Sequence, residues 1–211
     1  MNPTAPAVPH DLSGRRVPFV CAAVFLAAWT VAAIEPRFPR AWLLENLPLL
    51  PALPFLFVLY RRRRLSDRAW VQVTAFLLLH VYGAHYTYAN TPIGFWLQSS
   101  LELHRNHYDR FVHFAFGLLL VQPLRELLPQ PTVRRELFVA AAMIGTLSLA
   151  YEQLEWITAV LSDPAAGAAF LGAQGDAWDA QKDATCATLG SLVAVVISYP
   201  WRDSGSPARR R

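Results

Sequence analysis

Residues 137–161 read LFVAAAMIGTLSLAYEQLEWITAVL, and this stretch decides the fold class of the chain. It is longer than the roughly 20 apolar residues that a helix needs to cross a hydrocarbon core of about 30 Å. Its charged residues are Glu152 and Glu155, which both stand toward the carboxyl end. We therefore predict a transmembrane helix that carries two acids toward one face of the membrane.

Five further stretches on either side have the same character and predict helices over residues 17–34, 41–60, 69–89, 109–128 and 179–201. In the second of the six, Pro48, Pro51 and Pro54 are expected to kink the helix. The connections are short except for residues 90–108 and 162–178. The sequence thus predicts an all-α polytopic membrane protein, a bundle of about six transmembrane helices.

The composition agrees with a membrane protein and excludes several other classes. Of the 211 residues, 54% are hydrophobic and 16% are charged, against roughly 25% charged in an average soluble domain. A disordered chain is not this apolar. Two cysteines cannot build a disulfide scaffold. We find no P-loop, nucleophile elbow, HExxH or paired CxxC motif.

The distribution of basic residues predicts the orientation. Most of the 19 Lys and Arg residues lie on one side of the predicted bundle, above all in the run Arg61–Arg64. The positive-inside rule places that side in the cytoplasm, so both termini are predicted to be cytoplasmic. The prediction comprises a cytoplasmic tail at 1–16, a transmembrane domain at 17–201 and a basic cytoplasmic tail at 202–211. The arginine run then reflects topology, and we expect no nucleic-acid partner.

Polar residues gather at the outer ends of three predicted helices, on faces that continue inward with small residues. Helical spacing places Asp109 and His113 on one face, Glu152 and Glu155 on another, and Asp176, Asp179 and Asp183 on a third. An ionised side chain at the bilayer centre costs about 2.5–3.5 kcal/mol. We therefore expect these side chains to face the bundle interior and to surround one cavity that opens to the outer side.

Three motifs make the chain similar to a known family. They are Arg105-Asn106-x-x-Asp109-Arg110-x-x-His113-Phe114-x-x-Gly117, Tyr151-Glu152-x-x-Glu155-Trp156 and Gln174-Gly175-Asp176-x-Trp178-Asp179-x-Gln181-x-Asp183. Over residues 70 to 197 the chain resembles the YjdF-type family of bacterial inner-membrane proteins, a family defined by a domain of unknown function. The resemblance implies a multi-pass location in the bacterial inner (plasma) membrane, and it assigns no catalytic roles.

One hypothesis is a membrane-embedded enzyme. The outer acids exceed the nearby cations, and a divalent cation (Mg²⁺, Mn²⁺ or Ca²⁺) would balance them. Such an enzyme would act on a phosphate of a lipid or lipid-linked substrate. His113 would act with Asp109 as the catalytic acid or base, and Arg105 and Arg110 would bind the headgroup. The metal ligands would be the remaining acids of the cluster: Glu152, Glu155, Asp176, Asp179 and Asp183.

The same residues are compatible with two other functions. In a non-catalytic scaffold or accessory protein, Glu152 and Glu155 would pair with Arg105 and Arg110, and Asp109 with His113 would fix one helix. The aspartates would then only begin a helix, where acids interact favourably with the helix dipole. In a small proton-coupled transporter the acids would form a relay, but the inner halves of the helices lack polar residues. Whether the protein is an enzyme stays open at this level.

Overall fold

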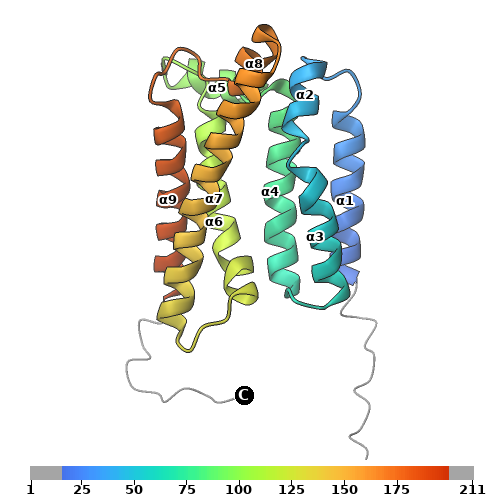
Figure 1. The fold of residues 1–211 in the computed structure, drawn as a ribbon, viewed down its shortest axis with the longest axis vertical. Coiled ribbons are helices and arrows are strands. Elements are labelled where there is room, and N and C mark those ends of the chain that lie inside the picture. Colours follow the sequence, from blue (N-terminus) through green and yellow to red (C-terminus); the bar gives the residue numbers. More distant parts are fainter. Residues whose placement is uncertain (1–15, 200–211) are drawn as a thin grey trace, which may run out of the picture.

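The computed structural model describes residues 16–199, and within that range the chain is all-α (Figure 1). The helices are α1 (Arg16–Ala32), α2 (Pro39–Glu45), α3 (Leu49–Arg61), α4 (Asp67–Tyr86), α5 (Pro92–Ser100), α6 (Tyr108–Leu127), α7 (Val133–Leu161), α8 (Pro164–Leu171) and α9 (Asp179–Ser198). Apart from Arg16, which begins α1, the two predicted tails lie outside the described residues. So do the last residues of the sixth predicted helix.

The second predicted helix is divided in two. The helix α2 ends at Glu45, and α3 begins at Leu49 after Pro48. Proline lacks a backbone N–H and disfavours helical geometry in the residue before it. Asn46 occupies the break: its amide donates to the carbonyl of Trp42 (2.7 Å), and its side-chain oxygen accepts from the indole of Trp29 in α1 (2.6 Å). The predicted kink is therefore a full interruption, held by polar contacts.

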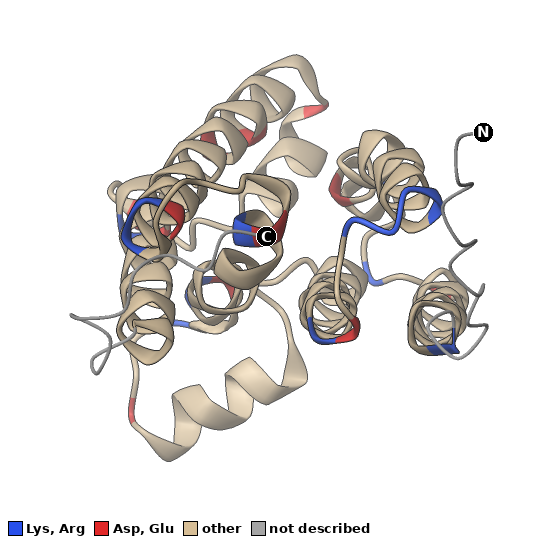
Figure 2. Ribbon diagram, turned by 90° about the horizontal axis from the view of Figure 1, so that it is seen from below, with Lys and Arg blue, Asp and Glu red and all other residues tan. Residues whose placement is uncertain are grey.

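The two long connections also contain helices. Residues 90–108 include α5 and residues 162–178 include α8, and both helices lie at the end of the bundle shown at the top of Figure 1. We call this the site end, and we call the end that carries the α3–α4 connection the opposite end. Figure 2, seen from the opposite end, shows basic residues on that connection, which are the arginines Arg62, Arg63 and Arg64.

The long helices form two groups: α1, α3 and α4 on one side, and α6, α7 and α9 on the other (Figure 1). The two groups join where α4 packs on α6. The most extensive contact is between α6 and α9, because Gly117 and Gly190 allow the two backbones to touch. Small residues at such positions are typical of helix packing in lipid.

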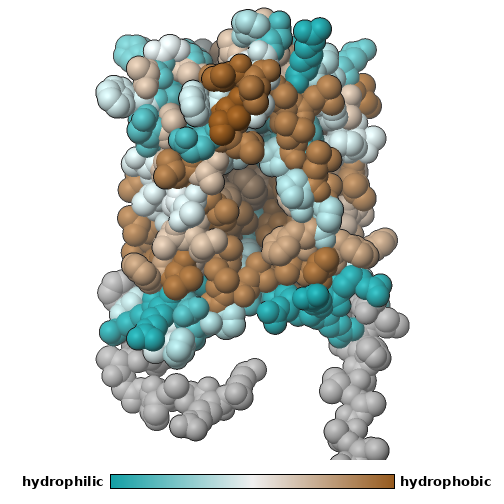
Figure 3. Space-filling model, in the orientation of Figure 1, coloured by the Kyte–Doolittle hydropathy of each residue, from teal (hydrophilic) through white to brown (hydrophobic). Residues whose placement is uncertain are grey.

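The sides of the bundle are apolar, as Figure 3 shows for one face. Large hydrophobic side chains such as Phe19, Phe138 and Leu161 are exposed there. By length and composition, the segments Pro39–Arg61 and Val133–Leu161 can cross a membrane, and Arg16–Ala32 is a shorter apolar helix. These surfaces fit contact with lipid chains.

Candidate functional site

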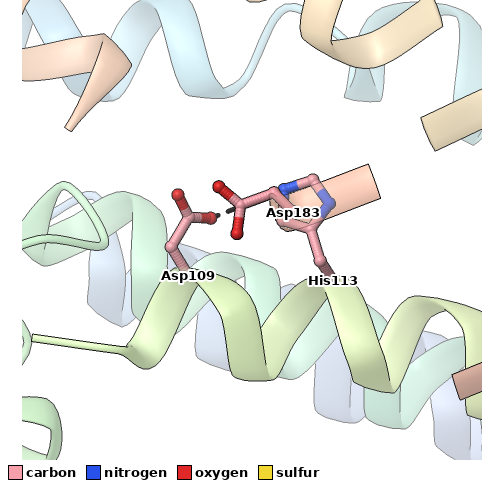
Figure 4. A group of neighbouring side chains, drawn as sticks. All are labelled: Asp109, His113 and Asp183. Atoms are coloured by element: carbon pink, nitrogen blue, oxygen red, sulfur yellow. Dashed lines mark ion pairs between the residues drawn. The ribbon is translucent and has the colours of Figure 1, made fainter. Parts of the chain in front are cut away.

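Three side chains from α6 and α9 converge near the site end (Figure 4). Asp109 and His113 lie one turn apart on α6, and Asp183 reaches toward them from α9. One ligand atom from each residue lies within 4.8 Å of the other two. The glycine contacts between α6 and α9 make this approach possible. Two carboxylates and an imidazole at this spacing can bind one metal ion.

Glu152 adds a fourth group from α7. Its Oε1 lies 3.5 Å from His113 Nε2, and Asp109 Oδ1 lies 3.6 Å from the same nitrogen. Glu152 and Asp183 are 7% and 2% exposed, yet Glu152 Oε1 and Asp183 Oδ1 accept no hydrogen bond from any described residue. Buried carboxylate oxygens normally have partners. These two oxygens are therefore available to a ligand.

The two arginines form a separate ion-pair network with the start of α9. Arg105 contacts Asp179 and donates to the carbonyl of Ala173 (3.1 Å). Arg110 donates to Asp176 (2.5 Å), which also accepts from Lys182 (2.7 Å). Arg110 approaches the site as well, with Nε 3.8 Å from Asp183 Oδ1. The network fixes the segment before α9 onto the start of α6.

The predicted site residues thus divide into two neighbouring groups. Asp109, His113 and Asp183 converge on one point, with Glu152 beside His113. Asp176 and Asp179 are instead engaged with Arg105 and Arg110. Glu155 follows Glu152 by one turn on α7 and is half-buried, outside the converging group. The ion pairs proposed between Glu152 and the arginines are not formed among the described residues, because His113 is the neighbour of Glu152. Those pairs were part of the scaffold hypothesis.

Burial and the charges of this network shift the pKa of two groups in the polar connections. The hydrogen bond from Lys182, with that from the backbone N–H of Trp178, holds the pKa of the Asp176 carboxyl well below its usual range. Desolvation, then the nearby Arg110 and Arg105, lower the pKa of His107. His107 is consequently neutral at pH 7, and its Nδ1 can accept from Arg110 (3.3 Å).

The connections above the site are joined by paired amide contacts. The side chain of Gln174 accepts from the backbone N–H of Asn106 (3.0 Å) and donates to its carbonyl (2.9 Å). Asn106 is fully buried and donates to the carbonyl of Thr91 at the start of α5 (3.1 Å). Both residues stand in the motifs quoted above, but their part in positioning the connections emerges only from the structure.

Sequence reasoning gave no role in the site to two polar groups that lie on its other side. Glu45, at the end of α2, is 1% exposed and accepts from the Tyr151 hydroxyl at 3.4 Å. His80 on α4 pairs with the Tyr88 hydroxyl at 2.6 Å. A lone acid in an apolar stretch was the available signal for Glu45, since such residues are rare unless they serve a site.

Comparisons with known proteins agree with the membrane architecture. A family model described as "Predicted membrane protein (DUF2238)" matches residues 17–204. The chain is similar to the inner membrane protein YjdF of Escherichia coli (strain K12), with 35% identity over 160 residues, which cover 74% of this chain and 76% of that protein. No solved structure matches the chain.

Proposed function

The chain belongs to the DUF2238 family of inner-membrane proteins, and from this premise we propose that it crosses the membrane six times, with both termini in the cytoplasm. The crossing segments are α1, α2 with α3, α4, α6, α7 and α9. The arginine run 61–64, at the end of α3 and in the connection to α4, supports this orientation, because basic residues accumulate on the cytoplasmic side. The site end then faces outward.

We propose further that the protein is a divalent-cation-dependent membrane enzyme that acts on the phosphate of a lipid or lipid-linked substrate. The observation that carries this proposal is the convergence of Asp109, His113 and Asp183, with two buried carboxylate oxygens nearby that accept no hydrogen bond from the described residues. Carboxylate-rich sites suit Mg²⁺, Mn²⁺ or Ca²⁺. The cation would balance acids that otherwise repel one another.

The chemistry would be hydrolysis of a phosphate ester. A bound cation polarises the phosphate and lowers the pKa of a coordinated water. Asp109, His113 and Asp183 would hold the cation, and Glu152 would accept the proton of the attacking water. As the new O–P bond forms, the bond to the leaving oxygen breaks, and that oxygen takes the proton from Glu152. In this proposal His113 is a ligand and Glu152 is the base, the reverse of the roles expected from the sequence.

The scaffold hypothesis keeps one specific observation in its favour. The network of Arg105 and Arg110 with Asp176 and Asp179 uses buried charge to hold the outer connections together. The transporter hypothesis has less support, because the described core between α6, α7 and α9 is apolar toward the opposite end. Val121, Leu137, Ala140 and Ile144 fill it.

Thermal unfolding of the detergent-purified protein, stripped of metal and titrated with Mn²⁺, tests the proposal. Binding to the folded state should stabilise the protein by about 2.7 kcal/mol at one hundred times the dissociation constant. Asp183→Asn and Asp109→Asn should lose that gain, because both residues are proposed ligands. Glu102→Gln, which changes an exposed acid at the same end, should keep it. If Mn²⁺, Mg²⁺ and Ca²⁺ all leave the wild-type melting temperature unchanged, the protein holds no cation there.

A further inference from the structure

A cavity of about 350 Å³ lies directly beside the site, between α3, α4, α6 and α7. Its volume falls within the roughly 300–1,000 Å³ of ordinary ligand pockets. Asp109 and His113 line it together with residues of the other three helices, so the cavity reaches the candidate metal ligands. It connects the chemistry of the site to the space between the two groups of helices.

The wall of this cavity changes from polar to apolar along the bundle axis. Toward the site end it is lined by His80, Asp109 and Tyr151. Further along the same helices, toward the opposite end, the lining residues are Phe76 and Phe116. A lipid of the outer leaflet has the same polarity, with its headgroup outside and its hydrocarbon chain pointing to the bilayer centre.

The cavity opens sideways on the apolar surface. Figure 3 shows a hollow in the middle of one face of the molecule, with hydrophobic residues around it. Leu147 on α7 lines the cavity and is 41% exposed, and Ala52 on α3 lines it from the other side. The interruption at Pro48 also borders the cavity. The opening therefore faces the surrounding hydrocarbon.

Two buried polar atoms in this wall make no hydrogen bond to any residue within 16–199. They are Nε2 of His80 and the hydroxyl oxygen of Ser148, in side chains that are 6% and 2% exposed. Both residues line the cavity. Buried polar groups are costly when they lack a hydrogen-bond partner. A polar ligand in the cavity near these two atoms would supply the missing hydrogen bonds.

We propose that the cavity admits one hydrocarbon chain of a phosphate-bearing lipid from the outer leaflet, through the opening between Ala52 and Leu147. Its apolar wall disfavours water, and in a membrane the neighbouring molecules are lipids. The lipid phosphate lies at the acids of the site, where it needs the cation to offset their charge. That last step rests on the proposed metal-dependent function, and the binding of the chain does not.

Photolabelling in lipid nanodiscs tests the proposal with the full chain. The probe is phosphatidylglycerol with a diazirine on one acyl chain, and mass spectrometry locates the labelled residues. Label is expected on Val112 and Phe116, which line the cavity from α6. Leu147→Trp should fill the opening and remove this label. Leu149→Trp, on the same helix at a residue that is 57% exposed and outside the cavity lining, should retain it.

The arms of this experiment separate the two proposals. Mn²⁺ should increase the label in wild type but not in Asp183→Asn, and Leu147→Trp should keep the thermal stabilisation by Mn²⁺. Competition by an unlabelled polyprenyl phosphate would identify an isoprenoid chain, and competition by a lysophospholipid an acyl chain. Label in the cavity without any effect of Mn²⁺ would overturn the metal-dependent function and leave the binding site for the hydrocarbon chain intact. Equal label in the cavity of both tryptophan variants, or label only on lipid-facing residues, would overturn the proposed binding site for the hydrocarbon chain.

Discussion

Gly117→Ala tests whether the close approach of α6 and α9 builds the site. A methyl group at residue 117 would lie 2.6 Å from the backbone nitrogen of Ser191 and closer still to the carbonyl oxygen of Ala187. Backbone atoms of a packed helix cannot rotate away. Since unstrained contacts of this kind are about 3.5 Å, the two helices must separate by at least about 1 Å.

Such overpacking costs about 1–3 kcal/mol of unfolding free energy. The same separation moves Asp183 away from Asp109 and His113. Metal–ligand distances tolerate only about 0.2 Å, so the variant should also lose the stabilisation by Mn²⁺. The measurement is thermal unfolding in detergent with and without Mn²⁺.

Gly145→Ala on α7 is the matched control. No described atom lies within 4 Å of a Cβ at this glycine. Alanine is a better helix former than glycine by about 1 kcal/mol in aqueous hosts, so this variant should be neutral or slightly stabilised and should keep the Mn²⁺ gain. If Gly117→Ala behaves like Gly145→Ala in both respects, the glycine contact does not position the ligands.

Three further predictions concern the ion pairs and the topology. Arg105→Met should lower the free energy of unfolding by about 3 kcal/mol, which chemical denaturation measures. This is the lower end of the range for a broken buried ion pair, because Asp179 still has Arg110 as a neighbour at 3.4 Å. The pKa of Asp176 is depressed in the folded protein. The ionised carboxyl therefore stabilises the fold above about pH 4, the pKa of Asp in the unfolded chain, and this stabilisation is lost as the pH falls through the pKa of the folded protein. Melting temperatures at falling pH should therefore decline less steeply for Asp176→Asn than for wild type. A reporter fused after residue 131 should read cytoplasmic, and one inserted within 165–173 external.

Each of these three predictions has its own control. Arg40→Met removes an exposed arginine and should change stability by less than about 0.5 kcal/mol; a loss equal to that of Arg105→Met would contradict the buried-pair argument. Lys182→Met removes the main cause of the depressed pKa and should flatten the pH profile as Asp176→Asn does. If the melting temperatures of both variants fall with pH as steeply as that of wild type, the ionisation of Asp176 does not contribute to stability. An external signal from the reporter after residue 131 would refute the proposed orientation.

Much of the architecture follows from sequence pattern alone. Long apolar stretches fix where helices form, because a chain in lipid must satisfy its backbone hydrogen bonds within each segment. The prediction of an all-α inner-membrane protein is confirmed by the helices and by the family. Helical spacing also predicted that Asp109, His113 and Gly117 share one face of a helix, and all three lie on α6 at that spacing. A kink at Pro48 was predicted, and the structure has a full division there. The helices α5 and α8 were not predicted, since short helices lack a clear periodic signal.

The partners of each charged side chain were decided by the tertiary structure. The scaffold hypothesis paired Arg105 and Arg110 with Glu152 and Glu155, and it gave the aspartates only the start of a helix. The sequence could not test this choice, because all these residues stand at the same end of the predicted bundle. Which pairs form depends on the direction of approach of α9, which the backbone contacts at Gly117 and Gly190 determine. That approach brings Asp179 to Arg105 and leaves Glu152 facing His113. Helical periodicity specifies the face of a residue, whereas the rotation and separation of packed helices select its neighbour.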